Sequence, residues 1–384
     1  MSTAVGASLA LAAALTACGG AEGPGSPNGS SAKLTFPDYY PADYADLVDE
    51  SRKESGKLSL YTNLAEPNLA PLIKGFQEKY PWISVSSAGD MSAEEVIQRY
   101  NAEASRKATD ADLIITAVAG EVWEDVIGGT GILDYQSVED KYYDESSNPH
   151  EGLYAFASDP LVMFYNPQVL PEKLHPTGLK DLAKIVEENP SEFPDQSIIT
   201  YDVSGFGYAG HKALAEKFPW AWDFYESIAP HTLAGPIGGG DQLERVTRGE
   251  SLVSVMSSGR TAYTGAVNAE GLIEVVLPDD ATIFYNRGEA ISKYTEDPAS
   301  AKLFLDYTLS EEGQALIGEG ESTPVRDIPV SESVPRTVKS ITAEVGEENV
   351  VFTGLEKTPG QKEFVKRFNK VFGLAGTTSQ DDNA

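Results

Sequence analysis

The chain has little cysteine and little positive charge. Its 384 residues contain one cysteine, Cys18, so no disulfide can form within the chain. Lys and Arg together number 29 against 59 Asp and Glu, which gives a formal net charge of -30. This excess of negative charge argues against nucleic acid or an anionic lipid surface as the partner of the folded body. No apolar run reaches the length of about 20 residues that a transmembrane helix needs.

Catalytic signatures are also missing. The sequence has no G-x-S-x-G elbow, no H-E-x-x-H, no P-loop and no G-x-G-x-x-G. Its histidines are scattered without the spacing of metal ligands: His150, His175, His211 and His231. We therefore expect neither a metal site nor a cofactor, and a binding protein rather than an enzyme. A lipid-anchored enzyme remains the alternative from another class.

The one cysteine ends a short apolar run, "ASLALAAALTAC". The run matches the hydrophobic part of a secretory signal peptide that ends in small residues. The sequence Leu15-Thr16-Ala17-Cys18 resembles the lipobox of bacterial lipoproteins. The resemblance implies a signal peptide over residues 1–17, cleavage before Cys18 and a lipid on its sulfur. One departure is that residues 1–12 hold no Lys or Arg.

A Gly/Pro/Ser-rich stretch, "GGAEGPGSPNGSS", follows the cysteine. Such a stretch cannot bury apolar surface, so we expect a flexible tether over residues 18–43. The body that follows is too long for one core and predicts two lobes. We expect lobe 1 over residues 44–158 and 276–322, lobe 2 over 159–275 and 323–375, and a disordered tail over 376–384. This layout predicts an exported protein that is lipid-anchored at the outer face of the cell membrane.

The first part of the body alternates strands and helices. Strands are expected in "KLSLYTN", "WISVSSAG" and "ADLIITAVAG", and helices in "NLAPLIKGFQEKY" and "SAEEVIQRYNAEASRK". Ser92 with Glu95 three residues later is a capping box for the second helix. The alternation predicts an α/β fold with a mostly parallel sheet. Ligands of such sheets bind beyond the carboxyl ends of the strands, which singles out Thr62, Asn63 and Ala117.

The second part repeats this order. "LYAFASDPLVMFYNPQVL" indicates two strands broken by Asp159-Pro160, and "IEVVLPDDATIFYNRGEAI" indicates a return crossing. Strands also end before the small polar turns at Ser204-Gly205 and at Ser257-Ser258. Further on, Asp297 is expected to cap a helix that has Pro298 at its first position, and Ser310 to start the next helix.

Polar turns recur before helices, at Ser92, Ser204-Gly205 and Gly238 to Gly240. Free backbone N–H groups and the helix dipole make such turns natural anion sites. The plain alternative is that Ser92 only caps its helix and the glycines only turn the chain. Because the turns come from both predicted lobes, we expect them to face one cleft.

These segments, taken in order, resemble a known family. "GKLSLYTNLAEPNLAPLIKGFQEKYP", "ADLIIT", "DPLVMFYNP", "ASAKLFLDYTLSEEGQALIG" and "TPVRDIPV" are similar to the solute-binding proteins of ABC importers that include ferric-ion, thiamine, phosphonate and sugar-phosphate binders. The resemblance covers about residues 44–330. It implies a type II periplasmic-binding-protein fold with a strand hinge, a small-molecule ligand in the cleft between the lobes, and ABC permease and ATPase subunits as partners.

The ferric binders of this family carry adjacent tyrosines at the end of the second-lobe strand, where this chain has Ser257 and Ser258. Serine hydroxyls suit hydrogen bonds to an oxyanion. We therefore expect a small anion, such as a phosphate or phosphonate ester or a carboxylate, with Arg260 or Arg287 as a bidentate contact. The expected ligand-binding residues are Thr62, Asn63, Ser92, Ala117, Ser204, Gly205, Gly239, Gly240, Ser257, Ser258, Arg260 and Tyr263.

The acidic surface favours the opposite sign, a cation such as ferric iron, thiamine or a polyamine. Tyrosines are available for a metal site or an aromatic cage: Tyr61, Tyr165, Tyr201, Tyr263 and Tyr285. Tandem tyrosines occur only at Tyr39-Tyr40 and Tyr142-Tyr143. A sensor subunit that feeds a signalling receptor is a further alternative to an importer component.

Overall fold

The computed structural model describes residues 34–89, 91–357 and 359–374. The predicted signal peptide, the lipidation site at Cys18 and the tail over residues 376–384 lie outside the described residues. The description that follows concerns the unit that begins at Tyr39. Among the described residues, no helix is both long enough and apolar enough to cross a membrane.

A single sheet contains all the strands of the described residues. Its main path has the order β2-β1-β3-β9-β4-β7-β5-β6, while β10 pairs with β9 and β8 pairs with β4. The pairs β1–β2, β1–β3, β5–β6 and β5–β7 are parallel, as the alternation of strands and helices predicts. The strands are β1 (Lys57–Thr62), β2 (Ser84–Ala88), β3 (Leu113–Thr116), β4 (Leu153–Tyr165), β5 (Ile198–Tyr201), β6 (Thr232–Gly235), β7 (Val253–Ser258), β8 (Glu274–Val276), β9 (Thr282–Ile291) and β10 (Val350–Thr353).

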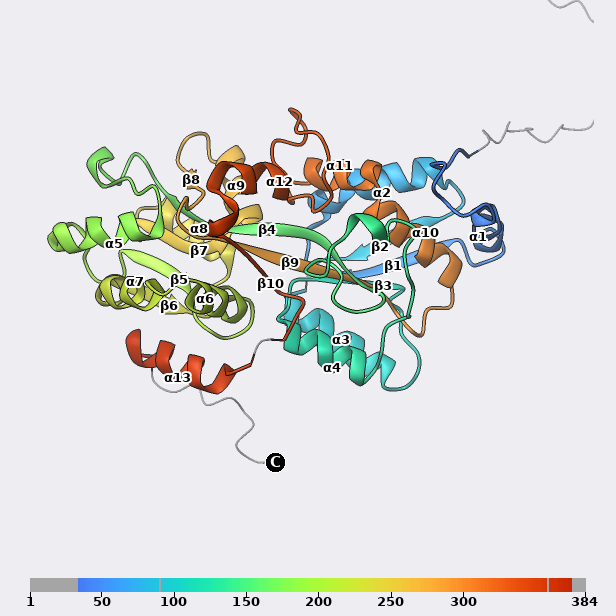
Figure 1. Ribbon diagram of the computed structural model, residues 1–384, viewed down its shortest axis with the longest axis horizontal. Coiled ribbons are helices and arrows are strands. Elements are labelled where there is room, and N and C mark those ends of the chain that lie inside the picture. Colours follow the sequence, from blue (N-terminus) through green and yellow to red (C-terminus); the bar gives the residue numbers. More distant parts are fainter. Residues whose placement is uncertain (1–33, 90, 358, 375–384) are drawn as a thin grey trace, which may run out of the picture. The chain divides into compact units, whose positions relative to one another are not determined.

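Two long antiparallel strands, β4 and β9, join the two lobes (Figure 1). The first part of β4 pairs with the last part of β9, and that part of β9 also pairs with β3 of lobe 1. The last part of β4 pairs with β7 of lobe 2. Every residue of both strands is buried. The predicted two-lobe α/β fold with a strand hinge is thereby confirmed.

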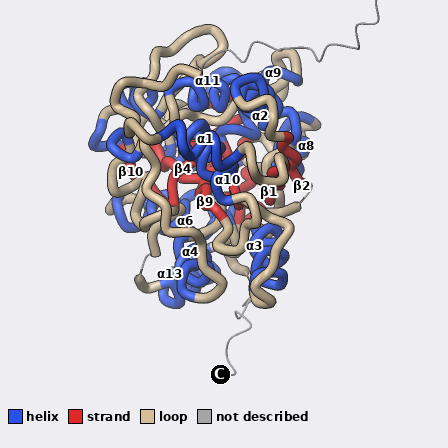
Figure 2. Tube along the Cα trace, turned by 90° about the vertical axis from the view of Figure 1, so that its right-hand side faces the viewer, coloured by secondary structure: helices blue, strands red, loops and turns tan. Residues whose placement is uncertain are grey.

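Helices cover both faces of the sheet (Figure 2). The helices α2, α9 and α11 lie on one side of the strands, and α3, α4, α6 and α13 lie on the other. The helices are α1 (Tyr44–Ser51), α2 (Glu66–Lys79), α3 (Ala93–Ala104), α4 (Gly120–Gly128), α5 (Leu179–Glu188), α6 (Phe206–Lys217), α7 (Ala221–Ile228), α8 (Gly239–Thr247), α9 (Gly259–Asn268), α10 (Pro298–Leu309), α11 (Glu311–Glu319), α12 (Val338–Val345) and α13 (Gln361–Val371).

The strand break expected at Asp159-Pro160 is absent, because β4 runs through both residues. A proline within a sheet cannot donate to a neighbouring strand. Pro160 is opposite Phe284 of β9, and β7 joins β4 only from Leu161 onward. The proline therefore lies where its missing N–H costs the sheet little, and the two predicted strands are one.

Helix caps confirm one expectation and correct another. Ser92 and Glu95 form the predicted capping box of α3, since the Ser92 hydroxyl accepts from the Glu95 backbone and the Glu95 carboxylate accepts from the Ser92 backbone. Asp297 is at the first position before α10, but its carboxylate accepts from Ser55 instead. The backbone N–H groups of Ala299 and Ser300, which have no partner within the first turn of α10, donate to the carboxylate of Glu54, a residue distant in sequence.

A third chain crossing contacts the hinge. The Ser158 backbone N–H of β4 donates to the Thr323 carbonyl, and the Thr323 backbone N–H donates to Asp159 Oδ1 at 2.9 Å. Beyond this point β10 pairs with the first part of β9, and the aromatic side chains of α13 pack against α6 and α7. These contacts accord with the predicted return of the chain to lobe 2 after residue 323, although the lobe boundaries themselves stay a prediction.

Candidate ligand site between the lobes

Arg287 is the most buried cation where the lobes meet. It lies on β9 and has 4% of its surface exposed. Its guanidinium donates to the Asn63 side chain, in the loop after β1, and lies 3.9 Å from the carboxylate of Asp159. Its Nε makes no hydrogen bond among the described residues. Burial, with a second guanidinium at Arg260 nearby, lowers the pKa of Arg287 to about 10, so Arg287 is still a cation at neutral pH.

Arg260 brings the second positive charge from lobe 2. It lies in the first turn of α9 and donates from Nη1 to Asn68 Oδ1 of α2 at 3.0 Å. Its Nε is also buried without a partner in the described part of the chain. Two guanidinium groups therefore lie close together, each held by an asparagine of lobe 1 and each with an unused donor. Two like charges repel each other, and the Asp159 carboxylate beside Arg287 offsets this only in part, because the pKa of Arg287 is still lowered. A bound anion would stabilise the pair further.

Tyr285 forms the aromatic part of the same region. Its ring stacks on Phe206 of α6 at a centroid distance of 4.3 Å and an interplanar angle of 22°. Its hydroxyl is buried and makes no hydrogen bond among the described residues. Burial raises the pKa of Tyr285; the carboxylates of Glu94 and Glu121 add to this and Arg287 opposes it. The phenol is therefore a neutral donor that lies near charges of both signs.

Glu94 of α3 reaches across to lobe 2. Its carboxylate contacts Gly205, and a side chain at that position would overlap with it. Gly205 is in the left-handed region, with φ of 57°, and immediately precedes α6. The Glu94 carboxylate therefore lies next to the turn before α6, where we expected an anionic ligand. The hydroxyl of the adjacent Ser204 donates to Asp202 Oδ1 at 2.5 Å.

Tyr201, at the end of β5, lines the lobe 2 side. Its hydroxyl is hydrogen-bonded to the Ser258 backbone and lies close enough to Gly239 that a Cβ there would be 2.8 Å away. Burial raises the pKa of Tyr201 to about 12, against the opposing effects of that hydrogen bond and of Arg260. Gly239 is thus a position of close approach, here by a tyrosine hydroxyl of the protein, and its contact with a ligand stays a prediction.

The structure therefore gathers five of the twelve expected residues: Asn63, Gly205, Gly239, Ser258 and Arg260. Polar atoms of several others are used elsewhere. The Thr62 hydroxyl accepts from the Leu64 backbone, Ser92 is an exposed helix cap, and Ala117 packs in the apolar core. Gly240 faces open space. We do not carry these four, or Ser204, into the proposed ligand contacts.

Ser257 and Tyr263 also point to other partners. Met256 has a positive φ of 55°, which places Ser254 and Ser257 on the same side of β7. Both hydroxyls donate to Gln242 Oε1 of α8, at 2.8 and 2.5 Å. The guanidinium of Arg336 lies over the ring of Tyr263, 3.5 Å from the ring centroid, in a cation–π contact. These two residues leave the proposed ligand contacts as well.

Some residues of this region gave no signal in the sequence. Asn68, Glu94 and Phe206 are ordinary helix residues by composition and spacing, and only the contact between the lobes distinguishes them. Arg287 and Tyr285, by contrast, are candidates from the sequence, Arg287 as a bidentate contact of an anion and Tyr285 for a metal site or an aromatic cage. A list of polar turns alone misses all five.

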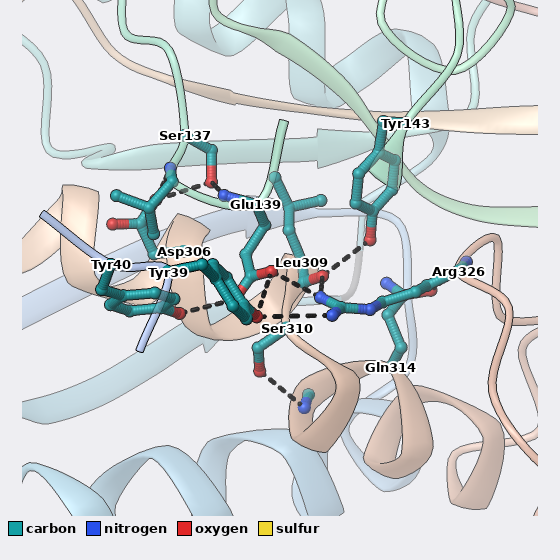
Figure 3. A network of polar contacts seen from close by, with 12 residues as sticks. Tyr39, Tyr40, Ser137, Glu139, Tyr143, Asp306, Leu309, Ser310, Gln314 and Arg326 are labelled. Carbon is teal, nitrogen blue, oxygen red and sulfur yellow. Dashed lines mark hydrogen bonds and ion pairs between the residues drawn. The ribbon is translucent and has the colours of Figure 1, made fainter. Parts of the chain in front are cut away.

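The tandem tyrosines belong to a different place, shown in Figure 3. Tyr39 and Tyr40 donate to the carboxylate of Glu139, and Arg326 donates to it at 2.6 Å. Glu139 has no exposed surface. The Tyr143 hydroxyl donates to the Leu309 carbonyl. This network joins the segment before α1 to the chain after α11, and three of the four tandem tyrosines are used in it as neutral donors.

The described residues contain no group of three or more His, Cys, Asp or Glu side chains that could hold a metal ion. His211 is buried and contacts Thr200, Tyr225 and the Tyr201 carbonyl. Burial lowers its pKa to about 4, so it is neutral at physiological pH. This is the satisfied buried histidine of a core.

Comparison with known families decides the class of the protein. Residues 72–345 match the model of the bacterial extracellular solute-binding protein family. The chain belongs to this family. Members of the family are binding proteins, and the match covers the hinge strands β4 and β9 and part of each lobe. No curated protein sequence matches the chain.

Solved structures show the same fold at low sequence identity. The substrate-binding protein of an ABC transporter from Agrobacterium tumefaciens has a TM-score of 0.70 at 21% identity, over 82% of this chain and 95% of that one. AfuA of Actinobacillus pleuropneumoniae, with fructose-6-phosphate bound, gives 0.62 at 19%, over 84% and 100%. Iron-bound HitA of Pseudomonas aeruginosa gives 0.59 at 17%, over 82% and 99%. The same fold thus carries a sugar phosphate in one relative and iron in another.

Proposed function

We propose that this extracellular solute-binding protein captures a small organic oxyanion between its lobes and serves an ABC importer. One observation supports the anion above the others. Arg260 and Arg287 lie close together, and each has a buried Nε without a partner among the described residues. A bound phosphate ester or carboxylate would accept from both guanidinium groups. Capture without chemistry is the expected activity.

Binding and lobe closure would be coupled through the same residues. Arg287 is on the hinge strand and bonds Asn63 of lobe 1, while Arg260 of lobe 2 bonds Asn68 of lobe 1. An anion that bridges the two guanidinium groups would add contacts only when the lobes are together. Hinge closure around a ligand follows from such differential contacts.

The proposal is tested with the full chain after removal of any carried ligand. Calorimetric titration with inorganic phosphate and with small phosphate esters should give binding that weakens as salt rises. Titration with ferric citrate should give no visible tyrosinate absorbance. Burial raises the pKa values of Tyr201 and Tyr285, which makes it more costly to form the tyrosinate that ferric iron binds. A coloured, tight ferric complex with no oxyanion binding would replace the proposal by the ferric alternative.

The permease and ATPase subunits of the importer are the proposed partners, and the protein is proposed to be held at the outer face of the membrane by a lipid on Cys18. The basis of the anchor is Leu15-Thr16-Ala17-Cys18 and the Gly/Pro/Ser stretch after it.

Replacing Cys18 with serine is expected to move the protein from the membrane fraction to the soluble fraction of its own host. Serine cannot form the thioether to the lipid, so the anchor is lost. Immunoblots of the two fractions measure the change, and Ser26→Ala in the tether serves as the control that stays with the membrane. Full retention of the Cys18→Ser protein in the membrane fraction would refute the anchor.

A further inference from the structure

The charges that surround the proposed anion site are not all positive. Tyr285 is influenced by charged side chains of both signs. The charge of Arg287 lowers the pKa of the Tyr285 hydroxyl, Glu94 and Glu121 of lobe 1 raise it, and Arg260 in turn lowers the pKa of Arg287. Geometry also ties Glu94 to this region, since its carboxylate contacts Gly205, the residue before the Phe206 ring that stacks on Tyr285. Asp159 lies 3.9 Å from Arg287. Two carboxylates therefore act on the Tyr285 hydroxyl, and a third lies beside Arg287.

This balance disfavours a bare dianion. A doubly charged ligand such as inorganic phosphate would be attracted by the arginines and repelled by Glu94 and Glu121, because unit charges a few ångströms apart at a partly exposed site interact by about 1 to 4 kcal/mol. Glu121 already has a partner in the Tyr208 hydroxyl at 3.3 Å. Glu94 has no ion pair within the described ranges, and its carboxylate contacts Gly205.

We propose that the captured solute is a small zwitterion, with an oxyanion group at Arg260 and Arg287 and an ammonium group at Glu94 and the Tyr285 hydroxyl. The inference rests on the proposed function and names the ligand class of that same site. Glu94 is the specificity-determining residue, since it is the acidic side chain from lobe 1 that contacts the start of α6 in lobe 2.

The aromatic side chains beside these charges agree with a ligand that has two ends. The rings of Phe206 and Tyr285 stack face to face, and Phe206 directly follows Gly205, which the Glu94 carboxylate contacts. An aromatic face stabilises an ammonium group near it and offers apolar contact to the short chain that joins the two ends. The oxyanion of such a ligand would accept from the unpaired Nε groups of Arg260 and Arg287. Its ammonium group would lie near the carboxylate of Glu94.

The test compares three probes on three proteins by calorimetry. The probes are inorganic phosphate, ethyl phosphate and O-phosphoethanolamine, of which only the last carries an ammonium group. The proteins are the full chain with its native sequence, Glu94→Gln and Glu95→Gln. Glutamine at position 95 retains the capping box of α3 while it removes a charge one residue away, so this variant is the matched control.

We expect the native protein to bind O-phosphoethanolamine at least about tenfold more tightly than ethyl phosphate. Glu94→Gln should remove that preference and strengthen inorganic phosphate by up to about tenfold, because a repulsive charge is gone. Glu95→Gln should leave the preference unchanged.

Three results would overturn the inference alone: equal binding of the two esters by the native protein, a preference that survives Glu94→Gln, or an equal loss in Glu95→Gln. Failure of all three oxyanions to bind the native protein, even at millimolar concentration, would instead remove the proposed function with it. Gel filtration and thermal unfolding of each variant show that a lost preference is not a lost fold.

Discussion

Replacing Arg287 with methionine is expected to weaken the captured oxyanion by about a hundredfold or more. Each hydrogen bond to a charged group is worth about 1.5 to 3 kcal/mol, and a guanidinium supplies two when it binds an oxyanion in the bidentate mode. A loss of about 3 kcal/mol corresponds to roughly a hundredfold in Kd. Methionine preserves much of the apolar length of the side chain, so the core around β9 stays filled. Calorimetric titration measures the change.

Two further variants make the result unambiguous. Arg287 also bonds Asn63 and lies near Asp159, so its removal could disturb the hinge. Arg260 is only half-buried, and Arg260→Met should weaken the same anion by about tenfold or more without that risk. Arg248, whose exposed guanidinium pairs with Glu244 on α8, provides the control substitution Arg248→Met, which should leave Kd unchanged. Unaltered binding in both Arg260→Met and Arg287→Met would show that the anion is held elsewhere.

The sequence predicts the fold of this protein well, but it predicts the candidate ligand site only in part. Alternation of short apolar runs with amphipathic helices predicts the parallel strands of lobe 1, because that pattern has few other solutions. Ser92 and Glu95 predict their cap, since both partners lie within one turn of helix. In each case the interaction that decides the structure is local.

Predictions fail where the deciding contact is distant in sequence. Asp297 has the right residue type for a cap, yet the backbone N–H groups of α10 donate to Glu54, a residue distant in the sequence. Asp159-Pro160 has the composition of a break, yet the position of Pro160 just outside the β7 pairing lets β4 continue. The same is true of Ser257, whose hydroxyl is used by Gln242. In each case the residue type has the expected local chemistry, but a partner distant in the sequence determines which contact it makes.

The site shows the same limit. A polar turn before a helix, such as Ser204-Gly205, predicts an anion site, but it does not indicate whether the anion is a ligand or a side chain of the protein. Only the structure places Glu94 of lobe 1 against that turn. The pair of guanidinium groups likewise depends on two residues from separate strands and helices that the hinge brings together. The character of the ligand therefore follows from contacts between lobes rather than from any one motif.

The network of Figure 3 is expected to carry the largest single contribution of a polar side chain to stability. Arg326 is almost fully buried, and its guanidinium donates to Glu139 at 2.6 Å and to the Leu309 carbonyl at 3.1 Å. Arg326→Met leaves the Glu139 carboxylate buried with only the hydroxyls of Tyr39 and Tyr40 as donors. Breaking a buried ion pair in this way costs about 3 to 5 kcal/mol, and urea unfolding measures the loss.

Comparison with an exposed pair and with a double variant identifies the cause. Lys339 pairs with Asp327 at the surface, where both side chains are mostly exposed, so Lys339→Met should change the free energy of unfolding by no more than about 0.5 to 1 kcal/mol. Adding Glu139→Gln to Arg326→Met should restore part of the lost stability, because the isolated buried charge is then gone. If Arg326→Met is no more destabilising than Lys339→Met, or if Glu139→Gln makes the double variant additively worse, the unpaired carboxylate is not the source of the loss and the network only fills space.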